Sequence, residues 1–243
     1  MSSVPALSIE DITAARRELD QRIVTTPVHE WQSPAIAERI GAGTRVFLKL
    51  ELFQRSGSFK ARAALLNMLR LDRAQRERGV TAISAGNHAI AVAYAARELG
   101  VHAKVVMIKT ANPFRVELCR KFGGEVEFAA DAHAGFRRVA EIEQAERRAL
   151  IHPFEGLGTA TGTATLGLEL CQQVADLDAV IVPIGRWNST APVNAAIATG
   201  TVWATSGLRG ANVLASRNSF HALTKMMIAA ANTPGAASGS TIR

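Results

Sequence analysis

Apolar residues along the first three quarters of the chain recur in two alternating patterns. Residues 45–50 place an apolar side chain at every second position, which is typical of a β-strand. Residues 58–71 instead carry Ala61, Leu65 and Met68 at helical spacing. The same patterns predict further strands at 80–84, 103–108, 125–129, 150–154 and 179–184, and helices at 87–99, 113–122, 133–147 and 164–174.

This alternation of short strands with helices predicts an α/β fold built on parallel sheets. The apolar run from Ala179 to Val182 supports it, because parallel strands are usually covered on both faces. Near the N-terminus, Ser8 and Asp11 resemble a capping box ahead of a helical run through Ile12. Ligands bind at the carboxyl ends of strands in such sheets, so the turns after the strands are the expected places for chemistry.

The pattern fails past Gly185. Small residues, Ser, Thr and Asn dominate there, and the apolar segment of note is 222–231, without a periodic strand signal. All 21 Asp and Glu residues lie before residue 186, whereas five of the 28 Lys and Arg residues follow it. We interpret 186–243 as a poorly structured or foreign segment.

Composition places the chain in the ordinary globular class. It has 243 residues, is 48% hydrophobic, and contains no run of the roughly 18 apolar residues that a membrane span needs. The first residues show no secretory signal pattern, so we expect a cytosolic protein without membrane contact. Cys119 and Cys171 lack zinc-ligand spacing and are interpreted as two buried thiols, with no metal site.

A candidate nucleophile lies at Lys60, in the segment Ser56-Gly57-Ser58-Phe59-Lys60. A lysine in the first turn of a helix, just after a glycine turn, can face a pocket where desolvation makes its amine nucleophilic. Taken alone, such a lysine is more often a solvated surface charge.

A second candidate segment, Ser84-Ala85-Gly86-Asn87-His88, lies between a predicted strand and a predicted helix. Backbone N–H groups at the start of a helix suit a carboxylate or phosphate, and Asn87 adds a side-chain donor. The plainer interpretation is a well-made helix cap with an incidental histidine at His88.

Together the two segments resemble the fold type II enzymes that use pyridoxal phosphate (PLP), above all the threonine and serine dehydratases with their serine racemase relatives. The resemblance spans about residues 8–185. Further matches follow in the same order at Asn112-Pro113, Arg115, 121–126, His152-Pro153-Phe154-Glu155, Gly162, 165–169 and Val182-Pro183-Ile184-Gly185.

The resemblance implies two open parallel-sheet domains of the tryptophan synthase β-like type, the second one incomplete. Residues 1–50 and 151–185 would then belong to the large domain, 51–150 would form the small domain, and 186–243 would lie outside the family pattern. Relatives are usually dimers or tetramers, so a homo-oligomer is implied if the full fold forms.

Roles for individual residues also follow from the resemblance. Lys60 resembles the lysine that holds PLP as a Schiff base and moves the α-proton, and Phe59 the residue packed against the cofactor ring. Asn87 resembles the side chain that bonds the 3′-hydroxyl of PLP. The turn from Ser84 through Ala85 and Gly86 to His88 resembles the loop that grips the substrate carboxylate. The implied reaction converts L-threonine or L-serine into a 2-oxo acid and ammonia.

Ala85 bears on which relative the chain resembles most. Racemases of this group carry a second serine in this loop as a base, and Ala85 has no ionisable group, which favours a dehydratase over a racemase. Ile90, Ile108 and Thr163 depart from residues common in relatives, which weakens the substrate assignment more than the family assignment.

Gly185 begins the expected glycine-rich loop whose amides would cradle the cofactor phosphate, but Arg186 and Trp187 follow it. Bulky Trp187 would block that close approach, which indicates a frameshifted or otherwise altered C-terminal segment and an inactive form. A competing hypothesis is a catalytically silent remnant that binds a partner. Nucleic acid could be that partner, but five spread charges make a weak patch and rank it well behind.

Overall fold

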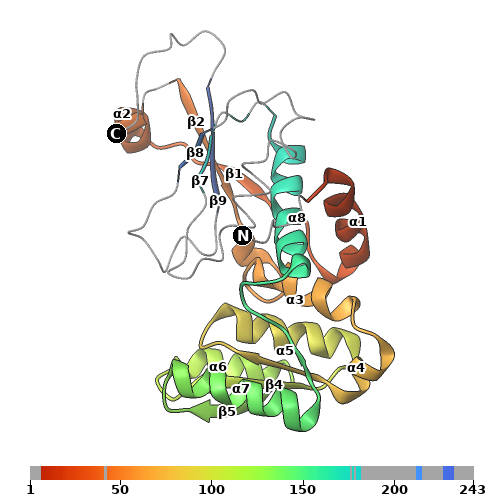
Figure 1. The fold of residues 1–243 in the computed structure, drawn as a ribbon. Coiled ribbons are helices and arrows are strands. Elements are labelled where there is room, and N and C mark those ends of the chain that lie inside the picture. The colour runs from red at the N-terminus through yellow and green to blue at the C-terminus, as the bar shows by residue number, and fades with distance from the viewer. Residues whose placement is uncertain are drawn as a thin grey trace, which may run out of the picture.

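The computed structural model describes residues 7–40, 43–175, 177, 179–181, 212–214 and 227–232 (Figure 1). Two sheets, each covered by helices, occupy opposite ends of the described structure (Figure 1). This arrangement confirms the α/β fold class. The domain boundaries at residues 50, 150 and 185 stay predictions, and Gly185 lies outside the described residues.

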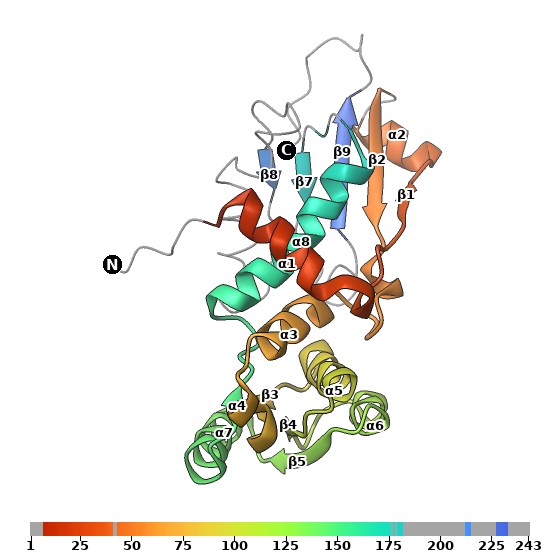
Figure 2. The ribbon, with the colours of Figure 1, turned by 90° about the vertical axis from the view of Figure 1, so that its right-hand side faces the viewer.

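One sheet is wholly parallel, with the strand order β5-β4-β3-β6. Its strands are β3 (Val80–Ile83), β4 (Ala103–Ile108), β5 (Glu125–Ala129) and β6 (Ala149–Leu150). The connecting helices α5 (Asn87–Leu99) and α6 (Pro113–Lys121) cover one face, and α7 (Ala132–Glu146) covers the other (Figure 2). The side chains of the apolar strands β3 and β4 are therefore mostly buried on both faces, whereas the edge strand β5 carries two glutamates and leaves Phe128 exposed.

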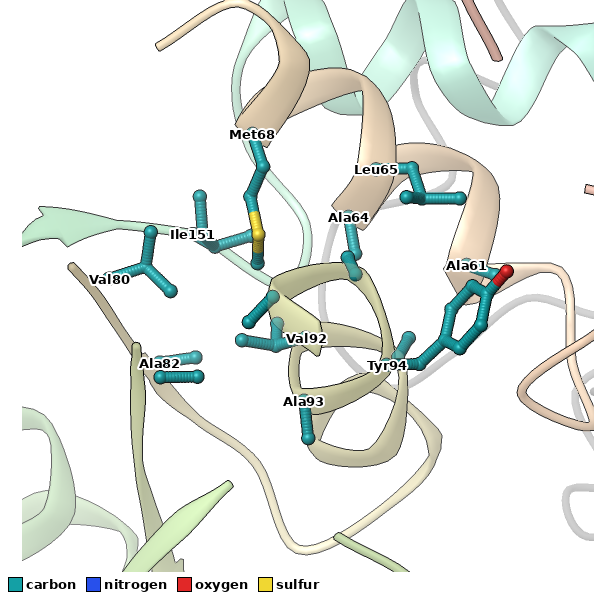
Figure 3. Close-up of a cluster of buried hydrophobic side chains, with 14 of the residues drawn as sticks. Ala61, Ala64, Leu65, Met68, Val80, Ala82, Val92, Ala93, Tyr94 and Ile151 are labelled. Atoms are coloured by element: carbon teal, nitrogen blue, oxygen red, sulfur yellow. The ribbon is translucent and has the colours of Figure 1, made fainter. Parts of the chain in front are cut away.

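The largest core cluster joins this sheet to α3 (Lys60–Leu69). Ala64, Leu65 and Met68 of α3 pack with Val92 of α5 and Ile151 (Figure 3). Helix α5 is buried along most of its length, because its repeated alanines allow neighbouring backbones to approach closely. This packing fixes the starts of α3 and α5 relative to each other.

The other sheet is mixed and has the order β1-β2-β9-β7-β8. Strand β2 pairs antiparallel with both β1 and β9, and β7 pairs parallel with β8. Its strands have the following bounds: β1 Val28–Glu30, β2 Thr44–Lys49, β7 Ala179–Ile181, β8 Asn212–Leu214 and β9 Met227–Asn232. Helices α1 (Ile9–Leu19) and α8 (Leu157–Gln173) cross on one face of this sheet (Figure 2).

Several elements differ from the sequence prediction. Helix α8 begins at Leu157 instead of residue 164, and β6 ends at Leu150 instead of residue 154. Strands β8 and β9 lie past Gly185, where no strand was expected, and β9 overlaps the apolar segment 222–231. Not predicted were β1, β8, β9, α2 (Pro34–Ile40), α4 (Arg73–Arg78) and the 3-10 turns Asp20–Arg22 and Glu51–Phe53.

The predicted capping box of α1 is confirmed, since Asp11 N donates to Ser8 Oγ at 3.0 Å and the Asp11 carboxylate accepts from Ser8 N. Within the described part of the chain, none of the helices combines the length and apolar character required for a membrane crossing. Cys119 is buried and Cys171 is half-buried, and burial raises the pKa of the Cys119 thiol to about 11.

Candidate active site

A cavity of about 370 Å³ lies at the carboxyl end of the parallel sheet. The ends of β3 and β4, the first residues of α3, α5 and α6, and the loop after β6 all contribute to it. Its lining comprises Phe59, Lys60, Ile83, Ser84, Ala85, Asn87, His88, Ile108, Arg115, Ala132, Phe136, Pro153 and Phe154. The structure thus brings Phe59 and Lys60 to one cavity with the turn that begins 24 residues after Lys60, at the strand ends where ligands were expected. Of that turn, Gly86 is the residue that does not line the cavity.

Lys60 is the first residue of α3, and its amine faces the cavity. Lys60 Nζ donates to the Pro153 carbonyl oxygen at 2.7 Å and lies 4.9 Å from the centre of the Phe154 ring. Burial lowers the pKa of Lys60 from 10.5 to about 8. A larger fraction of this amine is therefore in the nucleophilic, uncharged form near neutral pH than for an ordinary lysine.

The turn before α3 places Lys60 at this position. Gly57 has a φ of +74°, a left-handed conformation that glycine adopts without strain, and its N–H donates to Gln54 O at 2.6 Å. Ser58 is buried and Phe59 is the N-cap residue of α3. The Phe59 ring lies 5.4 Å from Lys60 Nζ, so the expected cofactor-ring neighbour lies beside the amine.

A buried ionic network holds the far side of α3. Arg62 Nη2 lies 2.8 Å from Glu51 Oε1 and 2.8 Å from Glu169 Oε2. Lys49 Nζ lies 3.0 Å from Glu169 Oε2, and Arg16 Nε lies 2.9 Å from Glu169 Oε1. Although burial alone would raise it, the hydrogen bond from Arg62 holds the pKa of Glu169 below its ordinary value. The network ties α3 to α8 just after Lys60.

The turn from Ser84 to Asn87 connects β3 to α5. Gly86 N donates to Ser84 Oγ at 3.1 Å, and Gly86 is the N-cap residue of α5 without a capping side chain. The first turn of α5 carries no acidic residue. Its uncapped N–H groups and partial positive charge therefore face the cavity edge, where an anion is favoured.

His88 contributes to the cavity in a form that does not titrate near neutral pH. Its Nε2 lies 2.9 Å from the Ile151 carbonyl oxygen, so this nitrogen is the donor and Nδ1 is the free acceptor. Nδ1 is buried and has no partner among the described residues. Burial, followed by the charge of Lys60, lowers the pKa of His88 to about 3. The histidine is thus a neutral, fixed group at physiological pH.

Several cavity residues had no assigned role from the sequence. Arg115 enters from α6, Phe136 and Ala132 from α7, and Pro153 and Phe154 from the loop after β6. Two of these sources could have been anticipated, because α6 and α7 follow strands of the same parallel sheet and begin at the same edge. The contact of Pro153 with Lys60 could not have been anticipated from the sequence, because it depends on the path of an irregular loop.

The residues present fit the expected cofactor, PLP. They supply an amine of lowered pKa for its aldehyde, aromatic rings at Phe59 and Phe154, and polar groups at Ser84 and Asn87. Among the described residues, those that line the cavity include no carboxylate, which suits an anionic ligand. The predicted phosphate-binding position, Gly185, lies outside the described residues.

Comparison with known proteins agrees with this arrangement. Residues 19–207 match the family described as pyridoxal-phosphate dependent enzyme, and this match continues past Gly185, where the motif resemblance ended. The chain is 49% identical over 200 residues to the phenylserine dehydratase of Ralstonia pickettii, covering 81% of the chain and 60% of that protein. It is 35% identical over 217 residues to the catabolic L-threonine dehydratase of Escherichia coli, covering 88% of the chain and 65% of that protein.

Among solved structures, maize serine racemase superimposes with a TM-score of 0.77 at 30% identity, covering 87% of this chain and 61% of the racemase. The chain thus spans 60% to 65% of the length of the two dehydratases. Since the family match covers well over half of the chain, the protein belongs to the pyridoxal-phosphate-dependent enzymes.

Proposed function

We propose that this protein is a PLP-dependent ammonia-lyase that removes the β-hydroxyl group of a hydroxyamino acid. The α-proton and the hydroxyl group leave as water, and the resulting enamine hydrolyses to a 2-oxo acid and ammonia. The observation that carries this proposal is the desolvated Lys60 amine, with a pKa of about 8, at the cavity beside the Ser84–Asn87 turn.

Each part of the cavity has a role in this proposal. When bound, PLP supplies the electron sink that stabilises the negative charge formed at the substrate α-carbon. Lys60 Nζ would hold the cofactor, and the same amine, oriented by the Pro153 carbonyl oxygen, would accept the α-proton. The N–H groups at the start of α5 bind the substrate carboxylate. The rings of Phe59 and Phe154 restrict access of water to the amine.

The proposed substrates are L-threonine, L-serine and hydroxyamino acids with a larger β-substituent. Ile83, Ile108 and Phe136 give the cavity a largely apolar wall, which suits a bulky apolar β-substituent. A phenylserine dehydratase is 49% identical to the chain, so phenylserine joins threonine and serine as a candidate. Assays of 2-oxo acid release from each of the three amino acids, run in parallel, rank them by the rate at which the protein converts them.

Racemisation is the second candidate activity, and its support is the similarity to maize serine racemase. Ala85 lines the cavity where the racemase-like loop would carry a serine, so a base on the opposite face is missing from this turn. We therefore expect 2-oxo acid formation to exceed formation of the D-amino acid. A chiral separation of the products measures both, and a dominant D-amino acid would reverse the ranking.

The direct experiment is borohydride reduction of the purified protein followed by peptide mass spectrometry. A pyridoxyl group on Lys60, absent in K60A, supports the proposal. Lys109, an exposed lysine outside the cavity lining, gives the matched control K109A, which should retain the adduct. A colourless protein without an adduct, whose nucleic-acid affinity falls steeply with salt, would favour the silent binding protein instead.

We also propose that the chain is altered relative to the family in the phosphate loop after Gly185, although the family match continues to residue 207. The support is the bulky Trp187 in the expected phosphate loop and the lack of carboxylates from residue 186 onward. Translation of the coding DNA in its other reading frames tests this. A glycine-rich continuation in another frame supports the alteration, and its absence contradicts it.

A further inference from the structure

Arg115 lies where a substrate anion would bind. It belongs to the first turn of α6, is half-buried, and lines the cavity. A Cβ added to Gly86 would stand 3.3 Å from Arg115 Nη1, so the guanidinium lies directly against the Ser84–Asn87 turn. Two sources of positive potential, the start of α5 and this side chain, therefore meet at one edge of the cavity.

The Arg115 guanidinium has no counter-charge within the described part of the chain. No carboxylate there lies within 4.0 Å of it, whereas Arg62 and Arg138 each pair with two glutamates. The first turn of α6 also lacks an acidic residue, and a cation at the start of a helix is electrostatically unfavourable. An anion that binds in the cavity beside Arg115 and the Ser84–Asn87 turn would compensate this charge.

The chemistry of the cavity identifies the anion. Other residues of the lining, among them Ile83, Ile108 and Phe136, are apolar and do not favour a charged substituent on the substrate side chain. The remaining anion of an amino acid is its α-carboxylate, whose two oxygens match the planar fork of a guanidinium. We infer that Arg115 is a substrate-positioning residue that binds the α-carboxylate together with the Ser84–Asn87 turn. This inference rests on the proposed function.

Steady-state kinetics of R115Q and R115K provide the first test. Loss of a charged hydrogen-bonding partner should raise KM about ten- to a hundredfold in R115Q, with a smaller increase in R115K, which keeps the charge but loses the fork. We expect kcat to change less than KM, because Arg115 holds a group that does not react. R120Q is the matched control, since Arg120 lies on the same helix but outside the cavity lining.

Binding calorimetry on the PLP-loaded protein separates this inference from the proposed reaction. L-Alanine and L-alaninamide are the probes, because they share the amine and side chain but differ in the carboxylate. The wild type should bind L-alanine more tightly, and R115Q should remove most of this difference while retaining its PLP.

Equal binding of the two probes by the wild type, or an unchanged difference in R115Q, would overturn the role of Arg115. A wild type that prefers L-alanine through Arg115 but releases no 2-oxo acid from any hydroxyamino acid would overturn the lyase proposal alone. A KM that is unchanged in R115Q would contradict the inference even if the protein is an active lyase.

Discussion

Lys60 depends on burial for its reactivity, because desolvation lowers its pKa from 10.5 to about 8. The fraction of uncharged amine grows tenfold per pH unit below that value and reaches a plateau above it. We predict that the rate of PLP capture by the cofactor-free protein rises up to about pH 8 and then levels off. Stopped-flow absorbance measures this rate, and a rise that continues to pH 10 would indicate an ordinary, solvated lysine.

His88 should make the folded state sensitive to acid. Its folded pKa of about 3 lies below the unfolded value of 6.5, so below pH 6.5 the unfolded state binds a proton that the folded state does not. Stability from this group is therefore lost as pH falls. We predict that the unfolding free energy of the wild type, relative to H88Q, drops by about 2 kcal/mol between pH 6.5 and 4.5. A constant difference between the two proteins in urea unfolding would refute the assignment.

At the scale of elements, the ionic network anchors α3 to α8 and so stabilises the position of Lys60. E169Q would leave the buried Lys49 without its carboxylate partner and the buried Arg62 with Glu51 as its remaining one. We predict a loss of about 3–5 kcal/mol in unfolding free energy. E77Q removes an exposed pair with Arg73 and should change stability by about 0.5 kcal/mol at most. Denaturant unfolding measures the free energy of unfolding of both variants. A similarly small loss of unfolding free energy in E169Q and E77Q would show that the network contributes little to stability.

The α3–α8 contact also depends on one glycine. A Cβ at Gly162 would stand 2.8 Å from Ala63 Cα, whereas a Cβ at Gly167 on the same helix meets no atom within 4 Å. We predict that G162A costs about 1–3 kcal/mol by forcing the helices apart, while G167A is neutral or gains up to about 1 kcal/mol in helix propensity. Thermal or denaturant unfolding distinguishes the two, and effects of equal sign and size would argue against a close helix contact.

The elements that sequence patterns predicted best have clear boundaries in the chain. Helix α5 matches its predicted range because Gly86 and Gly100 flank a continuous apolar stretch. The first turns of α8 were missed, since their glycines and threonines have low helix propensity and the close packing of Gly162 on α3 stabilises them instead. Strand β9 was missed because a short apolar run fits a helix and a buried strand equally well. The pairing with β2, which the sequence pattern does not reveal, makes this segment a strand.

For the whole molecule, topology explains which site residues the sequence could predict. Lys60 and the Ser84–His88 turn share one cavity because parallel strands end at the same edge of a sheet. The ionic partners of Arg62 were out of reach, since Glu169 lies 107 residues away and only the packing of α8 brings it close. The orientation of Arg115 likewise depends on how α6 packs beside α5, which motif spacing does not reveal.

Because the cavity draws on segments from residue 59 to residue 154, a ligand that binds it should stabilise the molecule as a whole. Binding to the folded state alone raises the unfolding free energy by about 2.7 kcal/mol at a ligand concentration of 100 times Kd. We predict that PLP raises the thermal midpoint of the wild type by several degrees, and that K60A loses most of this increase because it lacks the covalent attachment. K109A should respond like the wild type. An equal PLP-induced increase in K60A and the wild type would show that the cofactor binds without Lys60.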